Sequence, residues 1–185
     1  MELTLTLKEE AKQKSTAVVD SLTSDAVLAR KSDTVVIAVE GNEIAHHLAD
    51  SMESQFEVMP CKEVKHPADS SKSIGSVSED EVFIHGNNSN IPGDYIFHQV
   101  AALKYDTQSE ARTYLKGRNR LGLAHKTVIL VYDHLVNSDS VMACLNRIRK
   151  QQPHRILMAV TDAAYSAIRD IAPTVDEIMF LPTDH

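Results

Sequence analysis

Residues 127–160, TVILVYDHLVNSDSVMACLNRIRKQQPHRILMAV, decide the fold of this chain. Two short apolar runs, Thr127–Tyr132 and Arg155–Val160, flank a segment with helical spacing. Both runs are continuous rather than alternating, which is typical of strands buried on both faces of a parallel sheet. The helix expected between them has an apolar face formed by Val141, Cys144, Leu145 and Ile148. Two such strands joined by a helix form a right-handed crossover unit.

The alternation of strand and helix continues toward both ends of the chain. The run TVVIAV at 34–39 predicts another buried strand, and weaker strands are expected at 57–60 and 178–181. A helix capped by Thr161 and ending at Pro173 is expected before the last strand. The sequence therefore predicts an α/β fold with a doubly wound, mainly parallel sheet of about five strands, whose ligand crevice lies at the strand carboxyl ends. The residues expected to be buried in it are Val36, Ile129, Leu130 and Met158.

The middle of the chain is less regular. The polar stretch 62–72 is expected to be a loop, and 73–85 reads as two short strands joined by an acidic turn. A long helix is predicted at 94–116. These elements together predict a small hood or hairpin region beside the main sheet.

Length and composition favour one domain over the whole chain, 1–185. At 185 residues and 43% hydrophobic content, the chain can bury one sizeable core, with a polar amphipathic helix expected at 1–30 before a core at 34–184. The formal net charge of −7 argues against nucleic acid as a partner. No apolar run approaches the roughly 18 residues of a membrane helix, and the start lacks a signal-peptide pattern. A cytoplasmic protein without a membrane partner is expected.

Cysteine and histidine usage gives no sign of a metal site. Cys61 and Cys144 lie far apart in the sequence, outside any CxxC spacing, so both are expected to be buried, reduced thiols. Nine histidines include no HxxxH spacing, and the neighbours His46 and His47 diverge on a helix. The basic groups of 112–120 and 147–155 are expected to interact with the carboxyl ends of helices.

Five sequence segments carry a family resemblance. They are VEGN at 39–42, IGSVSED at 74–80, ARTYLKGR at 111–118, VILVYDHLVNSDS at 128–140 and VDEIMFLPT at 175–183. Their order and form resemble the type I phosphoribosyltransferase family, in particular its small bacterial branch, which has PRGG, IGAVAEDG, RxYRxGR, VILVDDGxATGAT and ADEVVCLxTP in these places. The resemblance implies displacement of pyrophosphate from phosphoribosyl pyrophosphate by a base or amine, usually with Mg²⁺.

The resemblance also implies a ligand site after the strand that begins at Thr127. In the family, two adjacent acids hold the ribose hydroxyls, and a TGxT turn at a helix N-terminus cradles the 5′-phosphate. Here Tyr132 replaces the first acid, whereas Asp133 retains the second and is the implied catalytic residue if the protein is active. His134 and Ser138 replace glycines, which lets Cβ atoms intrude where backbone approaches phosphate. The other implied ligand-binding positions here are Asn137, Asp139 and Ser140.

The implied pyrophosphate loop departs from the family pattern as well. Glu40 replaces the family's arginine, and Gly41 and Asn42 complete the loop. This inversion of charge predicts repulsion of pyrophosphate. Lys62 and Lys65 stand where the family places basic residues near the pyrophosphate.

Each of these residues also has a structural interpretation. A carboxylate such as Asp133 often serves a turn, Lys62 and Lys65 are compatible with solvated loop lysines, and ordinary helix capping selects the residue types at 137–140. Asp139 fits a helix start in the same way.

Three functions are compatible with the sequence. The favoured one is a non-catalytic family member that binds a nucleotide, sugar phosphate or protein partner, because Glu40, Tyr132 and His134 alter the phosphate-handling loops within an intact scaffold. The second is an active phosphoribosyltransferase with an altered loop and Mg²⁺; no other cofactor is expected. The third is an unrelated Rossmann-like hydrolase using Asp133 and His134, although GxGxxG, GxSxG and GxxxxGK[ST] motifs are missing. A homodimer is expected because the family commonly associates.

Overall fold

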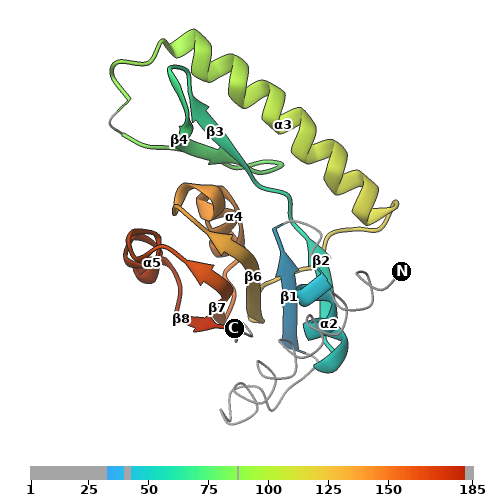
Figure 1. Cartoon of the computed structure of the whole chain (residues 1–185). Helices are drawn as coiled ribbons and strands as arrows, with labels where there is room; N and C mark the ends of the chain where they lie inside the picture. Colours follow the sequence, from blue (N-terminus) through green and yellow to red (C-terminus); the bar gives the residue numbers. More distant parts are fainter. Residues whose placement is uncertain (1–32, 40–42, 87, 182–185) are drawn as a thin grey trace, which may run out of the picture.

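A five-stranded parallel sheet forms the centre of the protein, in the strand order β2-β1-β6-β7-β8 (Figure 1). The computed structural model describes residues 33–39, 43–86 and 88–181, so the helix expected at 1–30 lies outside the described residues. The predicted α/β class with about five parallel strands is confirmed. The strands are β1 (Thr34–Ala38), β2 (Gln55–Val58), β6 (Thr127–Leu135), β7 (Arg155–Ala163) and β8 (Glu177–Phe180).

Helices cover both faces of this sheet, which makes it doubly wound. On one face, α2 (Glu43–Ser51) packs against the strands through Leu48. On the other lie α4 (Asp139–Lys150) and α5 (Tyr165–Ile171), with the short helix η3 (Ala172–Thr174) after α5. The four strand residues expected to be buried are fully buried: Val36, Ile129, Leu130 and Met158.

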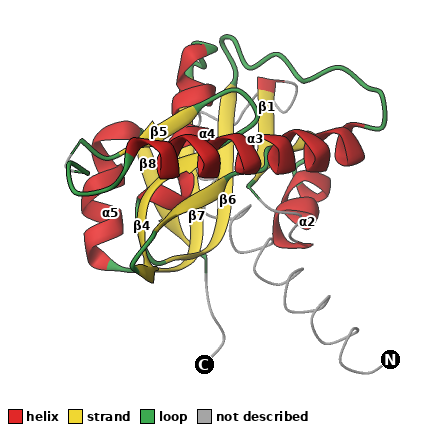
Figure 2. Cartoon of the chain, turned by 90° about the horizontal axis from the view of Figure 1, so that it is seen from above, coloured by secondary structure: helices red, strands yellow, loops and turns green. Residues whose placement is uncertain are grey.

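A second, antiparallel sheet and one long helix form a separate layer, which we call the hood (residues 62–115). Its strands are β3 (Lys62–His66), β4 (Asp69–Val77) and β5 (Val82–Ile84), and its helix is α3 (Gly93–Leu115). Figures 1 and 2 show the hood above the parallel sheet, with α3 running across it. At Gly75, where β5 approaches β4 closely, a Cβ atom would collide with the carbonyl oxygen of Phe83.

The loop predicted at 62–72 is wrong, because β3 and the first half of β4 form a hairpin there. In these strands Val64, Ile74 and Val77 are buried, and the rest of the hairpin is polar. The hairpin therefore depends on long-range packing against α3 and α4, and its local sequence pattern is weak.

Two strands of the parallel sheet run further than predicted. β6 and β7 stay paired through His134 with Asp162 and through Leu135 with Ala163, in parallel register. Thr161 therefore lies inside β7, and its prediction as a helix cap is wrong; α5 begins at Tyr165 after an N-cap at Ala164.

The two cysteines, Cys61 and Cys144, are buried and unbridged, as predicted. Within the described ranges, every helix is too short or too polar to cross a bilayer.

Candidate functional site

The residues that the family resemblance singles out lie at the carboxyl edge of β6 and at the start of α4. Asp133 is about half exposed, and its side chain is held by the neighbouring strand. The hydroxyl of Thr161 on β7 donates to Asp133 Oδ1 at 2.5 Å and also contacts the Asp133 carbonyl oxygen. The remaining oxygen, Oδ2, lies 3.8 Å from Nε2 of the exposed His134. Asp133 is thus oriented by Thr161 but open on one side.

The residues on either side of Asp133 contribute differently. Tyr132 is partly buried and packs against the core on the α4 face of the sheet. An aromatic ring therefore occupies the place where the family has a ribose-binding acid. His134 is exposed, and its backbone is paired with Asp162 in the β6–β7 ladder. The segment where a flexible phosphate loop was expected is thus partly strand, and only 136–138 connect β6 to α4.

Asn137 caps the start of α4. Its Oδ1 accepts the backbone N–H of Ser140 at 3.2 Å, and the Ser140 hydroxyl donates to the Asn137 carbonyl at 2.9 Å. Ser138, the residue before the helix, makes no capping bond with its side chain. These contacts match the structural interpretation of the polar turn.

A carboxylate from the hood lies at the same helix N-terminus. Glu63 on β3 accepts a hydrogen bond of 2.7 Å from Asn137 Nδ2. Asp139, in the first turn of α4, is buried and lies 2.6 Å from Nε2 of His85, which follows β5. Burial raises the pKa of the Asp139 carboxyl, although the neighbouring His85 acts to lower it. Two carboxylates of the protein itself, those of Glu63 and Asp139, therefore lie at the positive end of the α4 helix dipole.

Both lysines near this site are engaged by acidic side chains. Lys62 pairs with Glu110 of α3, and Lys65 pairs with Glu63. They lie on β3, so the interpretation as loop lysines is wrong. Their charges are partly compensated and less available to an anionic ligand.

The hood is fastened to α4 along the whole length of the helix. Ser76 accepts the backbone N–H of Ala143 at 3.0 Å, and Arg147 lies 3.2 Å from Glu79 and 3.0 Å from Asp80. We call these contacts, together with Glu63–Asn137, His85–Asp139 and Lys150–Glu81, the hood seam. A site at the start of α4 is consequently covered by the hood.

The basic segments have two roles, of which the sequence predicted one. Arg112 and Arg118 donate to backbone carbonyls in the last turns of α3, as expected for a helix carboxyl end. Arg120 and Arg147 instead bind carboxylates: Arg120 contacts Glu57 and Glu79, and Arg147 shares Glu79. In the sequence, the acidic turn at 79–81 and the basic end of α4 have opposite charges, and this could have indicated that they pair.

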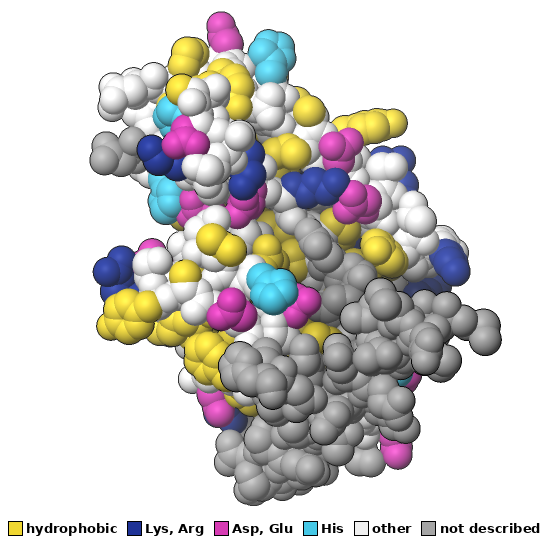
Figure 3. Space-filling view, in the orientation of Figure 1, with side chains coloured by type: hydrophobic (Ala, Val, Ile, Leu, Met, Phe, Trp, Pro, Cys, Tyr) yellow, Lys and Arg dark blue, Asp and Glu magenta, His cyan; other side chains and the backbone are white. Residues whose placement is uncertain are grey.

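Large apolar side chains are exposed where the strands of the sheet end. Val136 after β6, Tyr165 after β7 and Phe180 at the end of β8 are 72%, 83% and 61% exposed. Figure 3 shows hydrophobic side chains gathered at the edge of the molecule where α5 and β8 lie. We call these three residues the apolar edge.

Comparison with known proteins connects this architecture to solved structures. The sequence matches no family profile and no curated protein. The structure resembles TT1426 from Thermus thermophilus, with a TM-score of 0.72 and 19% identity over 95% of this chain and 85% of that one. It also resembles a hypoxanthine phosphoribosyltransferase from Staphylococcus aureus (TM-score 0.52, 12% identity, 96% and 76% covered). A purine phosphoribosyltransferase from Pyrococcus horikoshii is similar too, with a TM-score of 0.51 and 14% identity over 92% of this chain and 82% of that one.

The chain has the phosphoribosyltransferase fold. The resemblance noted in the sequence is thereby supported at the level of the fold.

For the Mg²⁺ that the family resemblance implies, the carboxyl edge keeps one of the two carboxylates, that of Asp133. The first of the family's two acids is replaced by Tyr132, which packs on the core. The second is retained as Asp133, whose Oδ1 accepts a hydrogen bond from Thr161. Hard cations such as Mg²⁺ need oxygen ligands, usually carboxylates. Among the described residues, no three His, Cys, Asp or Glu side chains are grouped to hold a metal. The implied pyrophosphate-loop residues Glu40, Gly41 and Asn42 lie outside the described residues.

Proposed function

We propose that this chain is a non-catalytic protein with the phosphoribosyltransferase fold, which binds a nucleotide, sugar phosphate or protein partner at its strand carboxyl ends. The contact that carries the proposal is the hydrogen bond between Glu63 and Asn137 at the N-terminus of α4. In the family that this chain resembles, that helix end receives the 5′-phosphate. A phosphate group here would meet the carboxylates of Glu63 and Asp139, and like charges at short range repel.

Changes in the implied ribose site support the same conclusion. Tyr132 provides no carboxylate for a ribose hydroxyl, and its ring is taken up by core packing. His134 and Asp162 hold β6 in the sheet at the position of the family's first glycine. Because β6 extends to Leu135, only residues 136–138 remain for a turn before the N-terminus of α4. The scaffold is kept, while Tyr132 and His134 replace two of the residues with which the family holds phosphoribosyl pyrophosphate.

Within this proposal, the apolar edge favours a protein partner over a sugar phosphate. Val136, Tyr165 and Phe180 are all more than half exposed at the strand ends. Sugar phosphates are recognised by polar and charged groups, whereas exposed apolar side chains at the strand ends favour contact with a protein.

An assay of pyrophosphate release tests the proposal. The chain is incubated with phosphoribosyl pyrophosphate, Mg²⁺ and a panel of purine and pyrimidine bases, and we expect no release above the rate without protein. The hypoxanthine phosphoribosyltransferase of Staphylococcus aureus, which shares the fold, is the positive control. Release that depends on base and disappears in Asp133→Asn would overturn the non-catalytic assignment.

A second candidate is an active phosphoribosyltransferase with an altered loop, and the geometry of Asp133 favours it. This carboxylate is retained, held by Thr161 and about half exposed. Under this alternative, Thr161→Val would lower the rate by releasing Asp133 from its orientation. Under the non-catalytic proposal, Asp133→Asn and Thr161→Val have no effect in this assay, because the original chain releases no pyrophosphate.

A further inference from the structure

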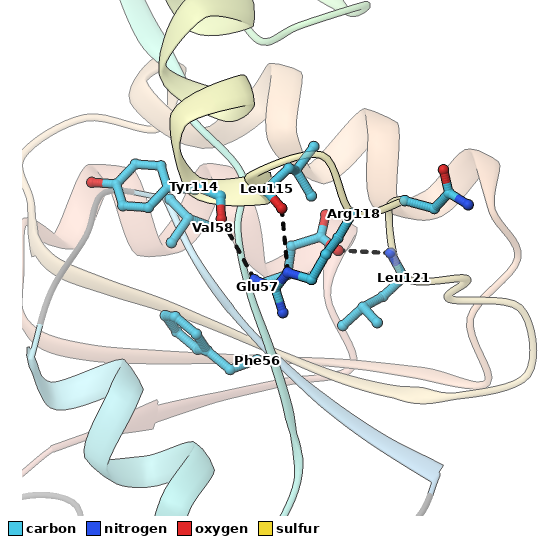
Figure 4. Close-up of a pocket in the computed structure, with 8 residues that line it drawn as sticks. Phe56, Glu57, Val58, Tyr114, Leu115, Arg118 and Leu121 are labelled. Carbon is cyan, nitrogen blue, oxygen red and sulfur yellow. Dashed lines mark hydrogen bonds between the residues drawn. The ribbon is translucent and has the colours of Figure 1, made fainter.

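A small pocket lies beside the edge strand β2, under the end of α3, and away from the β6–α4 turn (Figure 4). Its volume is about 130 Å³. Phe56 and Val58 of β2 line one side, and Leu115 of α3 and Leu121 line others. Apolar side chains therefore form most of its wall.

One cation lies at this pocket. After α3, the chain turns through Lys116 and Gly117, which have positive φ values of 48° and 82°. This turn brings Arg118 back under the helix, where its Nε donates to the Leu115 carbonyl at 3.3 Å and its Nη2 to the Tyr114 carbonyl at 3.5 Å. Figure 4 shows the Arg118 guanidinium below the last turn of α3, on the side of Phe56.

The charge of Arg118 has no carboxylate partner among the residues that the structure describes. Glu57 also lines the pocket, but its Oε1 binds Arg120 and its Oε2 accepts the backbone N–H of Leu121 at 2.7 Å. A guanidinium has five N–H donors, and the two carbonyl bonds use two of them. Arg118 is exposed and lines the apolar pocket, so its remaining N–H donors are accessible to a ligand.

The size and the lining of the pocket select a class of ligand. A dry protein cavity of roughly 150 Å³ holds one benzene molecule, so this space suits a single ring. Guanidinium groups bind carboxylates through paired, charge-assisted hydrogen bonds. We infer that the pocket binds a small monocyclic carboxylate, whose ring contacts Phe56 and Leu115 and whose carboxylate binds Arg118. Tyr114 and Asn119 also line the pocket.

Titration with benzoate, followed by NMR of the ¹⁵N-labelled chain, tests this site. We expect saturable shifts at the amides of Leu115, Asn119 and Leu121, with a dissociation constant on the order of 1 mM for so small a ligand. Benzyl alcohol, a neutral ring of similar size, should bind at least about tenfold more weakly, because it lacks the charge-assisted bond.

Two arginine variants with the same net charge provide the comparison. Arg118→Gln should weaken benzoate binding by about ten- to a hundredfold and should leave the weak binding of benzyl alcohol unchanged. Arg112→Gln, which removes an arginine of the same helix outside the pocket, should bind benzoate like the original chain. Lack of saturation up to about 50 mM benzoate, or equal affinity in Arg118→Gln, would overturn the inference. Shifts confined to residues away from β2 and the end of α3 would overturn it as well.

Discussion

The side-chain amide of Asn137 donates a 2.7 Å hydrogen bond to the carboxylate of Glu63, across 74 residues of sequence. This bond joins the start of α4 to strand β3, and so places a hood carboxylate at a helix N-terminus. It also fixes the amide whose oxygen caps the backbone N–H of Ser140. One side chain thus stabilises the helix and fastens the hood.

The first prediction concerns the stability that Asn137 provides. Asn137→Ala removes the cap of α4 and leaves Glu63 without this donor, so the free energy of unfolding should fall by about 1–2 kcal/mol. Asn119→Ala, an exposed asparagine for which the structure gives no hydrogen bond, is the matched control and should change stability by less than about 0.5 kcal/mol. Urea denaturation of both variants measures the difference; equal midpoints would contradict the role given to Asn137.

The buried charges that hold the hood on the core give a second prediction. Arg120 and Arg147 share Glu79, and all three side chains are largely buried. Burial also lowers the pKa of Arg120, although Glu57 opposes the shift. Glu79→Gln leaves two buried guanidinium groups without this charge, and should cost about 3–5 kcal/mol.

Lys72→Ala is the control for that variant. It removes the exposed pair between Lys72 and Asp69, which lie 3.2 Å apart, and such pairs contribute at most about 1 kcal/mol. Thermal unfolding of the two variants should separate them clearly. A smaller loss in Glu79→Gln than in Lys72→Ala would show that the cluster does not hold the hood.

A third prediction follows from the thiol of Cys61. Burial raises its pKa from 9.0 to about 11, so in this range the folded chain keeps a proton that the unfolded chain has lost. The free energy of unfolding should therefore fall as the pH rises from about 9 to 11. A shift of this size corresponds to about 2–3 kcal/mol. In Cys61→Ala, this part of the pH dependence should disappear, as measured by urea denaturation at several pH values; an unchanged slope would contradict the assignment.

Self-association is the fourth prediction, and it depends on the outer face of α3. Phe97 and Tyr105 on this helix are 70% and 69% exposed. In an antiparallel pair of α3 helices centred on Tyr105, Asp94 of one copy would face Lys116 of the other. We therefore propose a homodimer, with a mass in light scattering of twice the 20.5 kDa of one chain.

Variants of exposed aromatic residues test this dimer. Phe97→Ser combined with Tyr105→Ser should give monomers, whereas Tyr165→Ser, an exposed tyrosine on α5, should leave the mass unchanged. A mass near 20.5 kDa for the original chain over a wide concentration range would exclude the dimer.

The parallel sheet could be predicted from sequence because its central strands are continuous apolar runs. Val36 and Ile129 are paired neighbours in the register, and both are fully buried. The hood hairpin could not, since β3 and most of β4 are polar and Val64 finds its apolar partners on α3. Local pattern carries little information about such long-range pairing.

The candidate site was predictable in its residues but not in its contacts. The motif resemblance singled out Asp133 and Asn137, whereas their partners Thr161 and Glu63 come from distant segments. His134 was expected in a loop because the apolar run ends at Tyr132 and the family resemblance places a phosphate loop there. Pairing with Asp162 at the end of β7 overrides that local preference.

Calorimetry with phosphoribosyl pyrophosphate and Mg²⁺ tests the central claim most directly, because it measures binding without assuming an acceptor base. We predict no heat of binding for the original chain at micromolar to low millimolar ligand. Tyr132→Asp combined with His134→Gly and Ser138→Gly should gain measurable affinity, and adding Glu63→Gln should increase it by roughly tenfold, because one carboxylate leaves the helix N-terminus. Micromolar binding by the original chain would contradict the account and make Asp133 the first residue to mutate.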